Sequence, residues 1–364
     1  MEQLNINIEG KRIRVLIGSS ITDEILQLIN KNHKDHKVAV ITDSKLEKLC
    51  EPLLNSLNSL KPLLISVPPG EKSKSRENKA KIEDQLLDNK FGRDSVIIAL
   101  GGGVIGDLAG YVASTLNRGV PLIHVPTTLL AMVDSSIGGK TGINTSHGKN
   151  LIGTIYQPDA IISDLDFLKT LLEKEFKNGL AEIVKIAATS DPKLLNYIEK
   201  NVRNIENRDT NTLLHIIKRS VQLKIDVIEK DTTETGLRQI LNFGHTISHA
   251  LETNSKYEGM HGHFVSLGIS VETKISKLTG NLKDNDANRI ISLLETLKLP
   301  TKIKEKIELN RISELMLADK KTRNQKPRFV ILKEIGKVKT AGKVYSFEVD
   351  KAIVYKAIGL SKND

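Results

Sequence analysis

The sequence contains no tryptophan, one cysteine and few aromatic residues, and each shortage excludes a class of protein. A single cysteine, Cys50, rules out an internal disulfide framework and fits a reducing compartment. Aromatic residues make up 4% of the chain, which argues against a surface on which nucleic-acid bases stack. No apolar run approaches the roughly 18 residues of a membrane span, and the N-terminus resembles neither a secretory signal nor a transit peptide. We therefore expect a cytoplasmic protein that binds neither membrane nor nucleic acid.

The rest of the composition is ordinary for a folded protein, with 39% hydrophobic and 27% charged residues. A chain of 364 residues is long enough for two domains. The net charge is +10, and the lysines are spread along the whole sequence, which is typical of a solvated surface. The alternative is attraction of an anionic partner, which a small phosphorylated and carboxylated substrate would satisfy as well as a nucleic acid.

Strand-like and helix-like segments alternate in the first part of the chain, after a predicted hairpin at 6–18. This alternation predicts a parallel sheet with crossover helices. Beyond about residue 165 helical periodicities dominate. The predicted helices there are 173–188, 192–202, 210–230, 239–253, 262–279 and 285–298, with a short strand at 327–333. We therefore predict an α/β fold with a parallel-sheet domain at 1–165 and a mainly α-helical domain at 166–364.

The most informative stretch follows the predicted strand Ser95–Leu100, where five glycines occur within ten residues. Gly101, Gly103 and Gly106 form the pattern G-x-G-x-x-G between a strand and a helix. Backbone N–H groups and the helix dipole at such a turn favour a phosphate group. The pattern lies later in the chain than the usual dinucleotide fingerprint and has no acidic residue about 20 positions on. A tight turn without a ligand is the alternative.

Further polar residues end predicted strands, at the edge where parallel sheets bind ligands. Asp43 suits ribose hydroxyls, and Thr127 and Thr128 end another strand. The segment DSSIGGKT has Asp134 where a nucleoside-triphosphatase P-loop needs glycine, so that function is excluded. Lys140, in the glycine turn of this segment, suits a substrate phosphate as a point charge.

Two apolar helices of the second part carry polar residues at helical spacing. Glu182 and Lys185 lie one turn apart in the first, where a surface ion pair is the alternative to a site. In the second, four polar residues spaced four, three and four apart predict a polar stripe on one helical face. Burying polar side chains without partners is costly, so such a stripe on an apolar helix indicates a binding or catalytic site. Its members are Arg238, Asn242, His245 and His249.

One carboxylate and two imidazoles in this part of the chain suggest a divalent metal site that keeps positions open for substrate. Glu182, His245 and His261 would make such a set. Spacing alone leaves His249 and His263 as competing ligands.

Over about residues 67–321 the chain carries a series of motifs that resemble, in the same order, those of the 3-dehydroquinate synthase family. The matching motifs are PPGEKSK, GGGVIGDLAGYVAS, VPTTLLAMVDSSIGGKTGIN, GKNLIGTIYQP, GLAEIVK, ETGLRQILNFGHTISHALE, HGH and DKK. The resemblance implies a Rossmann-like NAD-binding α/β domain followed by an α-helical metal-binding domain, in a homodimer. It also implies conversion of a sugar phosphate, 3-deoxy-D-arabino-heptulosonate 7-phosphate, to 3-dehydroquinate plus phosphate. The implied steps are transient oxidation by NAD, phosphate elimination, re-reduction and intramolecular aldol closure.

The resemblance also assigns roles to residues. It assigns zinc or cobalt to Glu182, His245 and His261. The residues that it assigns to NAD are Asp43, Pro69, Gly70, Glu71, Lys72, Ser73, Lys74, Gly103, Val104, Ile105, Gly106, Asp107, Thr127, Thr128, Lys140, Lys149, Phe167, Leu168, Lys169 and Thr170. Those that it assigns to the substrate are Asp134, Lys140, Asn150, Lys185, Lys224, Arg238, Asn242, His249 and a lysine of the DKK motif, Lys320 or Lys321. Arg118 is expected to reach the substrate phosphate of the partner subunit. The family usually has glutamate where His263 stands, and this exchange would alter the surroundings of the metal or its preference.

Other functions fit part of the pattern. Another sugar phosphate cyclase, such as an amino-dehydroquinate synthase, is one alternative, although Arg238, Asn242 and His249 count against cyclitol-forming synthases. A metal-dependent polyol dehydrogenase would not need Lys140, Lys224 and Arg238 together, and it would accumulate NADH. A basic nucleic-acid-binding protein would explain the net charge, but the sequence offers no reading surface for one.

Overall fold

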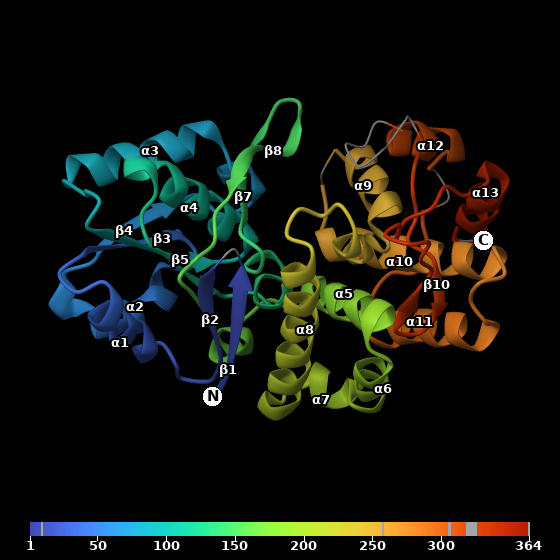
Figure 1. Ribbon diagram of the computed structural model, residues 1–364, viewed down its shortest axis with the longest axis horizontal. Helices are drawn as coiled ribbons and strands as arrows, with labels where there is room; N and C mark the ends of the chain where they lie inside the picture. Colours follow the sequence, from blue (N-terminus) through green and yellow to red (C-terminus); the bar gives the residue numbers. More distant parts are fainter. Residues whose placement is uncertain (9, 257, 305–306, 318–325, 363–364) are drawn as a thin grey trace. The chain divides into compact units, whose positions relative to one another are not determined.

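The computed structural model describes residues 1–8, 10–256, 258–304, 307–317 and 326–362. The chain divides into two compact units, Met1–Leu171 and Leu172–Asp364 (Figure 1). The sequence predicts the boundary between the two domains at 165/166, six residues before the division between these units. The predicted fold class is confirmed, because the first unit is built on a mostly parallel sheet and the second is mainly helical.

The first unit contains a seven-stranded sheet in the order β1-β2-β9-β6-β5-β3-β4. Its strands are Glu2–Ile8 (β1), Lys11–Gly18 (β2), Lys37–Asp43 (β3), Leu63–Val67 (β4), Ser95–Gly101 (β5), Leu122–Pro126 (β6) and Ala160–Asp164 (β9). β1 and β2 form the predicted antiparallel hairpin, and the other neighbours pair in parallel. A separate antiparallel hairpin is formed by Lys140–Thr145 (β7) and Gly148–Ile155 (β8).

Helices pack on both faces of this sheet, and the central strand β5 explains why. Every residue of β5 is buried, and residues 96–100 within it form a continuous apolar run. Ile97 and Ala99 lie in one core cluster with helices Arg76–Asp88 (α3) and Gly103–Thr115 (α4). The alternate residues Val96, Ile98 and Leu100 lie in a second cluster, with helices Asp23–Asn32 (α1) and Glu47–Ser56 (α2). The period of two along a strand thus divides β5 between two layers of helices.

The second unit consists mainly of helices. They are Glu173–Ser190 (α5), Pro192–Lys200 (α6), Val202–Glu206 (α7), Thr210–Lys230 (α8), His245–Asn254 (α9), His261–Leu278 (α10), Asp284–Thr296 (α11), Leu309–Leu317 (α12) and Lys351–Gly359 (α13). A small hairpin joins Leu332–Glu334 (β10) to Lys337–Val338 (β11). Residues of α9, α10, α12 and α13 share one apolar cluster around the fully buried Phe329.

The predicted helix 239–253 is wrong as a single element. Residues Leu237–Asn242 form a 3₁₀ turn (η6), and α9 begins only at His245. Gly244, between them, has φ +82°, and a Cβ there would lie 2.8 Å from the backbone nitrogen of Ile269. The left-handed conformation of Gly244 separates η6 from α9. The predicted polar stripe, which runs from Arg238 to His249, therefore does not lie on one continuous helical face.

The structure also differs from the sequence-based prediction at the strand 327–333 and at Lys140. The predicted strand 327–333 is mostly irregular, with an isolated bridge between Phe329 and Phe347 before β10 begins. Lys140 begins strand β7, and the glycine turn lies just before it, at Gly138 and Gly139.

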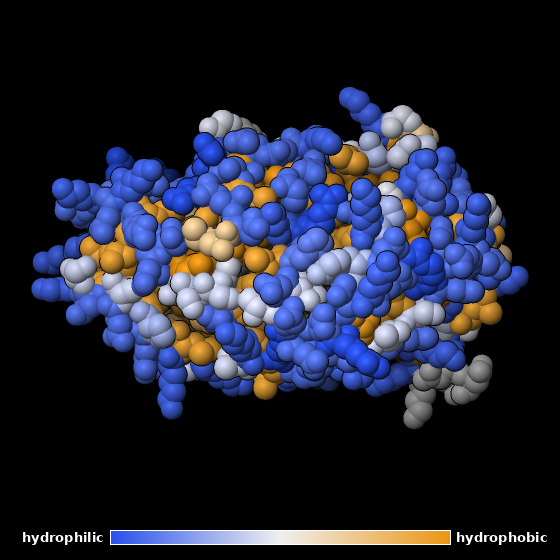
Figure 2. Space-filling view, turned by 90° about the horizontal axis from the view of Figure 1, so that it is seen from below, coloured by the Kyte–Doolittle hydropathy of each residue, from blue (hydrophilic) through white to orange (hydrophobic). Residues whose placement is uncertain are grey.

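Hydrophilic side chains cover most of the face shown in Figure 2, and apolar side chains occupy small separate areas. This distribution fits the solvated, lysine-rich surface inferred from the sequence. Within the described ranges, no helix combines the length and the apolar character needed to cross a membrane.

Candidate active site

The glycine-rich turn of the first unit joins β5 to α4. The backbone N–H of Thr127, just after β6, donates to the carbonyl of Gly101 at 3.0 Å, which fixes the two strand ends together. A Cβ on Gly101 would lie 2.7 Å from the side chain of Ile105, so the turn requires glycine. No side chain among the described residues caps α4 at Gly102. This uncapped N-terminus at the carboxyl edge of the sheet can bind an anion.

Charged side chains surround this turn. Lys74 is 4% exposed and forms an ion pair with Asp107 of α4. Burial raises the pKa of Asp107, and the charges of Glu71 and Asp134 add to this, while Lys74 opposes it. Asp134 itself lies in a π-helical turn, Ala131–Ser135, and is partly buried. Lys74, Asp107 and Asp134, which the sequence assigned to NAD or substrate, therefore lie close enough to influence one another's charge.

Asn144, which the sequence analysis missed, connects the β7–β8 hairpin to this group. Its side-chain amide donates to Oε1 of Glu71 at 2.7 Å, and its backbone N–H donates to the carbonyl of Lys74 at 2.8 Å. Its Oδ1 accepts from the backbone N–H of Asn150 at 3.0 Å. The hairpin residue Asn150, which has φ +56°, is thereby held to the same part of the unit.

The other residues assigned to NAD lie near the carboxyl ends of the strands. Asp43 ends β3, accepts from the N–H of Lys45 at 2.9 Å, and has its pKa raised by burial. Thr128 lies beside the glycine turn, 3.2 Å from a Cβ on Gly102. Gly70 has φ +98°. The remaining ones occupy the segments after β4 and β9 or the hairpin: Pro69, Lys72, Ser73, Lys149, Phe167, Leu168, Lys169 and Thr170. Arg118, at φ +69°, and Lys140 are exposed.

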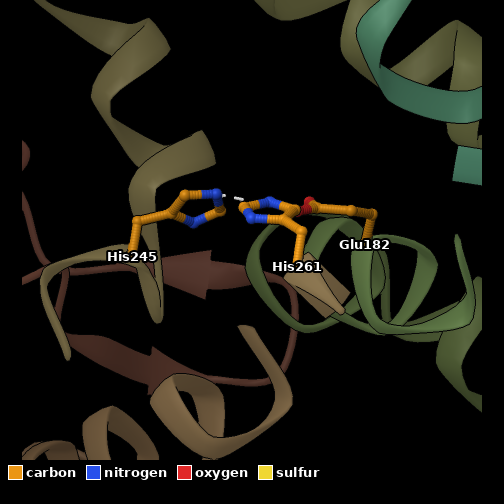
Figure 3. A group of neighbouring side chains, drawn as sticks. All are labelled: Glu182, His245 and His261. Carbon is orange, nitrogen blue, oxygen red and sulfur yellow. Dashed lines mark ion pairs between the residues drawn. The ribbon is translucent and has the colours of Figure 1, made fainter. Parts of the chain in front are cut away.

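In the second unit, Glu182, His245 and His261 converge (Figure 3). Glu182 comes from α5, His245 is the first residue of α9, and His261 is the first residue of α10. Oε1 of Glu182 lies 3.6 Å from Nε2 of His245 and 3.3 Å from Nε2 of His261. One ligand atom from each residue lies within 4.8 Å of the others. A carboxylate and two imidazoles at these distances fit a divalent metal ion with open positions.

Close packing of α10 explains this convergence. A Cβ on Gly262 would lie 2.1 Å from the carbonyl oxygen of Asn178 in α5, and one on Gly268 would lie 1.9 Å from that of Gly244. The N–H of Gly262 also donates to the side chain of Asn178, which caps α10 from another helix. Glycine at these positions lets α10 approach α5 and α9 closely enough for His261 to join the ligand set.

Both nitrogens of the His261 imidazole face carboxylates. Nδ1 lies 2.6 Å from Oε1 of Glu252, and Nε2 faces Glu182. Burial lowers the pKa of His261, but the hydrogen bonds to Glu182 and Glu252 outweigh it and raise the pKa to about 10. Burial and the nearby Lys177 charge lower the pKa of His263. The His261 imidazole therefore lies between two carboxylates, with Nδ1 toward Glu252 and Nε2 toward Glu182.

The residues assigned to substrate in this unit are largely buried. Lys185 pairs with Glu182 and is 3% exposed, and Lys224 of α8 is 7% exposed. Arg238 is 4% exposed, and its Nη1 donates to the carbonyl of Thr232 at 2.8 Å. Its backbone N–H donates to Asp231 at 2.9 Å. Three buried cations in this unit could balance the charge of an anionic substrate.

Asn242 and His249 complete this set. The amide of Asn242 donates to Oε1 of Glu234 at 2.7 Å. His249 lies one helical turn after His245, with ring centroids 5.4 Å apart. Only Glu182, His245 and His261 form a potential metal cluster among the described residues, so His249 and His263 do not join it. Lys320 and Lys321 lie outside the described residues.

Comparison with known proteins shows which family the chain resembles. The chain matches the family described as 3-dehydroquinate synthase N-terminal over residues 64–178 and the one described as 3-dehydroquinate synthase C-terminal over residues 179–322. A 3-dehydroquinate synthase of Dehalococcoides mccartyi is 38% identical over 96% of this chain and 98% of that protein. One of Geobacter metallireducens is 41% identical over 92% of this chain and 94% of that protein.

Two solved enzyme structures share the fold. A 2-deoxy-scyllo-inosose synthase complexed with carbaglucose-6-phosphate, NAD+ and Co2+ has a TM-score of 0.87 at 23% identity, covering 99% of this chain and 100% of that one. A 2-epi-5-epi-valiolone synthase from Streptomyces hygroscopicus with NAD+ and Zn2+ bound has a TM-score of 0.85 at 24% identity, covering 96% of both chains.

Proposed function

The chain belongs to the 3-dehydroquinate synthase family, and from this premise we propose how its residues perform the reaction of that family. The enzyme is a phosphate-eliminating carbon–oxygen lyase of the shikimate pathway. It converts 3-deoxy-D-arabino-heptulosonate 7-phosphate to 3-dehydroquinate plus phosphate. The observation that carries the assignment of roles is the convergence of Glu182, His245 and His261 in a buried part of the second unit.

Glu182, His245 and His261 would hold the metal, zinc or cobalt. The donor set fits such an ion, and the buried Glu182 carboxylate supplies the negative charge. A bound ion supplies a Lewis acid that lowers the pKa of adjacent substrate hydroxyls. His249, one turn after His245, would accept or return a proton near those hydroxyls.

The carboxyl edge of the first unit's sheet would bind NAD. The uncapped N-terminus of α4 faces the pyrophosphate in this proposal, and Asp43 accepts from ribose hydroxyls. Bound NAD supplies a hydride acceptor that is regenerated within one turnover. The glycines of the turn allow the close approach of backbone to ligand that a side chain would block.

The charged ends of the substrate would be bound by separate sets of residues. Arg238 and Lys224 would bind the carboxylate, and the planar guanidinium suits a bidentate contact. Hydrogen bonds from Arg238 to Asp231 and to the carbonyl of Thr232 hold it in place for that contact. Lys140 and Asn150 would hold the phosphate.

A homodimer, in which the exposed Arg118 reaches the phosphate bound by the partner subunit, forms part of the proposal. Sedimentation velocity of the purified chain tests it, and a monomer at working concentrations would contradict it.

The activity is tested by incubating the metal-loaded protein with 3-deoxy-D-arabino-heptulosonate 7-phosphate and NAD. We expect stoichiometric release of phosphate without net NADH, because the hydride returns to the substrate. A polyol dehydrogenase would instead accumulate NADH. Glu182→Ala is expected to lose both bound metal and phosphate release, and full metal stoichiometry in that variant would refute the ligand assignment.

A further inference from the structure

We propose that Glu252 is a positioning residue for the metal ligand His261. Its Oε1 lies 2.6 Å from Nδ1 of the imidazole, on the side of the ring opposite Nε2, which lies 3.3 Å from Glu182. An Nδ1–H that donates to a carboxylate leaves the lone pair of Nε2 available for a metal ion. The inference rests on the proposed role of Glu182, His245 and His261 as metal ligands.

The placement of Glu252 in the fold supports this role. It lies seven residues after His245 on α9, which is two helical turns along the same face. One helix therefore supplies a ligand and also contacts the ligand supplied by α10. Because the Glu252 side chain is 10% exposed, its partial desolvation has to be offset by a partner, and His261 donates to it.

A purely structural ion pair between Glu252 and His261 is the competing explanation. Such a pair would contribute to the stability of the fold, and its loss would not change how long a bound metal ion stays. A positioning role instead links the carboxylate to the orientation and basicity of the ligand. The retention of zinc and the protonation of the ring therefore distinguish the two roles.

The first measurement is the rate at which the zinc-loaded full-length protein transfers zinc to an excess of chromophoric chelator. We expect Glu252→Leu, which removes the acceptor but fills the space, to release zinc about 10- to 100-fold faster. Glu252→Gln keeps an acceptor without its charge and is expected to fall between Leu and the unaltered protein. Glu258→Gln, at an exposed position close to His261 in the sequence, is the matched control and should release zinc at the unaltered rate.

The second measurement needs no substitution. Long-range ¹H–¹⁵N spectra of the zinc-loaded protein, labelled at histidine, should show His261 protonated at Nδ1 and metal-bound at Nε2. A proton on Nε2 would overturn the proposal, and so would release from a folded Glu252→Leu within threefold of the unaltered rate. If Glu252→Leu does not fold, the ¹H–¹⁵N spectrum of the unaltered protein tests the proposal by showing which nitrogen of His261 carries the proton. A chain that binds no zinc at all refutes the metal site itself, which is a separate result.

Discussion

At the scale of single residues, we expect metal binding at the proposed ligand His261 to depend on pH, because the ion and a proton compete for the ring. Without metal, the hydrogen bonds to Glu182 and Glu252 outweigh burial and raise the pKa of His261 to about 10. A metal ligand must lose its proton, so each bound ion displaces one from this ring. Below that pKa, zinc affinity should rise about tenfold for each unit of pH.

Competition with a chelator of known protonation behaviour between pH 7 and pH 9 measures this slope. The sign follows from the raised pKa: the protonated, metal-free form is favoured at low pH and is lost as the pH rises toward 10. His147→Gln is the control, because that histidine is exposed and lies in the first unit. A zinc affinity that does not change over this range would show that His261 is already neutral.

The candidate metal ligands could be predicted from the sequence in part, and the residues that contact them could not. Helical spacing marks Glu182 and His245, but it leaves His249 and His263 as competitors of His261, and only the family resemblance selects the set. Glu252 lies seven residues after His245 and therefore on the same helical face, so extending the polar stripe beyond His249 would have included it. Asn178 caps a helix more than 80 residues away, and no local pattern signals such a tertiary contact.

At the scale of secondary-structure elements, the close approach of α10 to α5 can be tested at Gly262. Alanine there would bring its Cβ to about 2.1 Å from the carbonyl oxygen of Asn178, so the first turn of α10 must shift. We expect Gly262→Ala to unfold more easily, by about 1–3 kcal/mol, and to hold zinc more weakly because His261 moves with the turn. Thermal unfolding and zinc content measure the two effects.

Gly359→Ala is the matched control for this substitution. A Cβ at Gly359, the last residue of α13, meets no atom within 4 Å, so stability should not fall and zinc content should stay unchanged. A Gly262→Ala protein with unaltered stability and zinc content would show that α10 can relax without moving His261.

The same kind of contact explains where the prediction of elements failed. Apolar and polar periodicity through 239–253 favours one helix, whereas the chain turns at Gly244 with φ +82°. The turn arises because Gly268 of α10 packs against the carbonyl of Gly244, a contact between segments that periodicity does not encode. The helix α8 was predicted closely because its own sequence marks its start, where the side chain of Asp209 caps the first turn.

At the scale of the whole molecule, the residues proposed for NAD and for metal belong to different compact units, each with its own buried core. Removing the metal with a chelator should therefore abolish phosphate release while NAD affinity, measured by calorimetry, stays within about threefold. The reciprocal variant is Gly103→Val, which places a branched side chain at the first residue of α4 and crowds Ser135, 3.0 Å from its Cβ. This variant should weaken NAD binding and retain one zinc ion per chain. Loss of zinc in folded Gly103→Val protein, or loss of NAD affinity on chelation, would show that the two sites depend on each other for binding as well as for turnover.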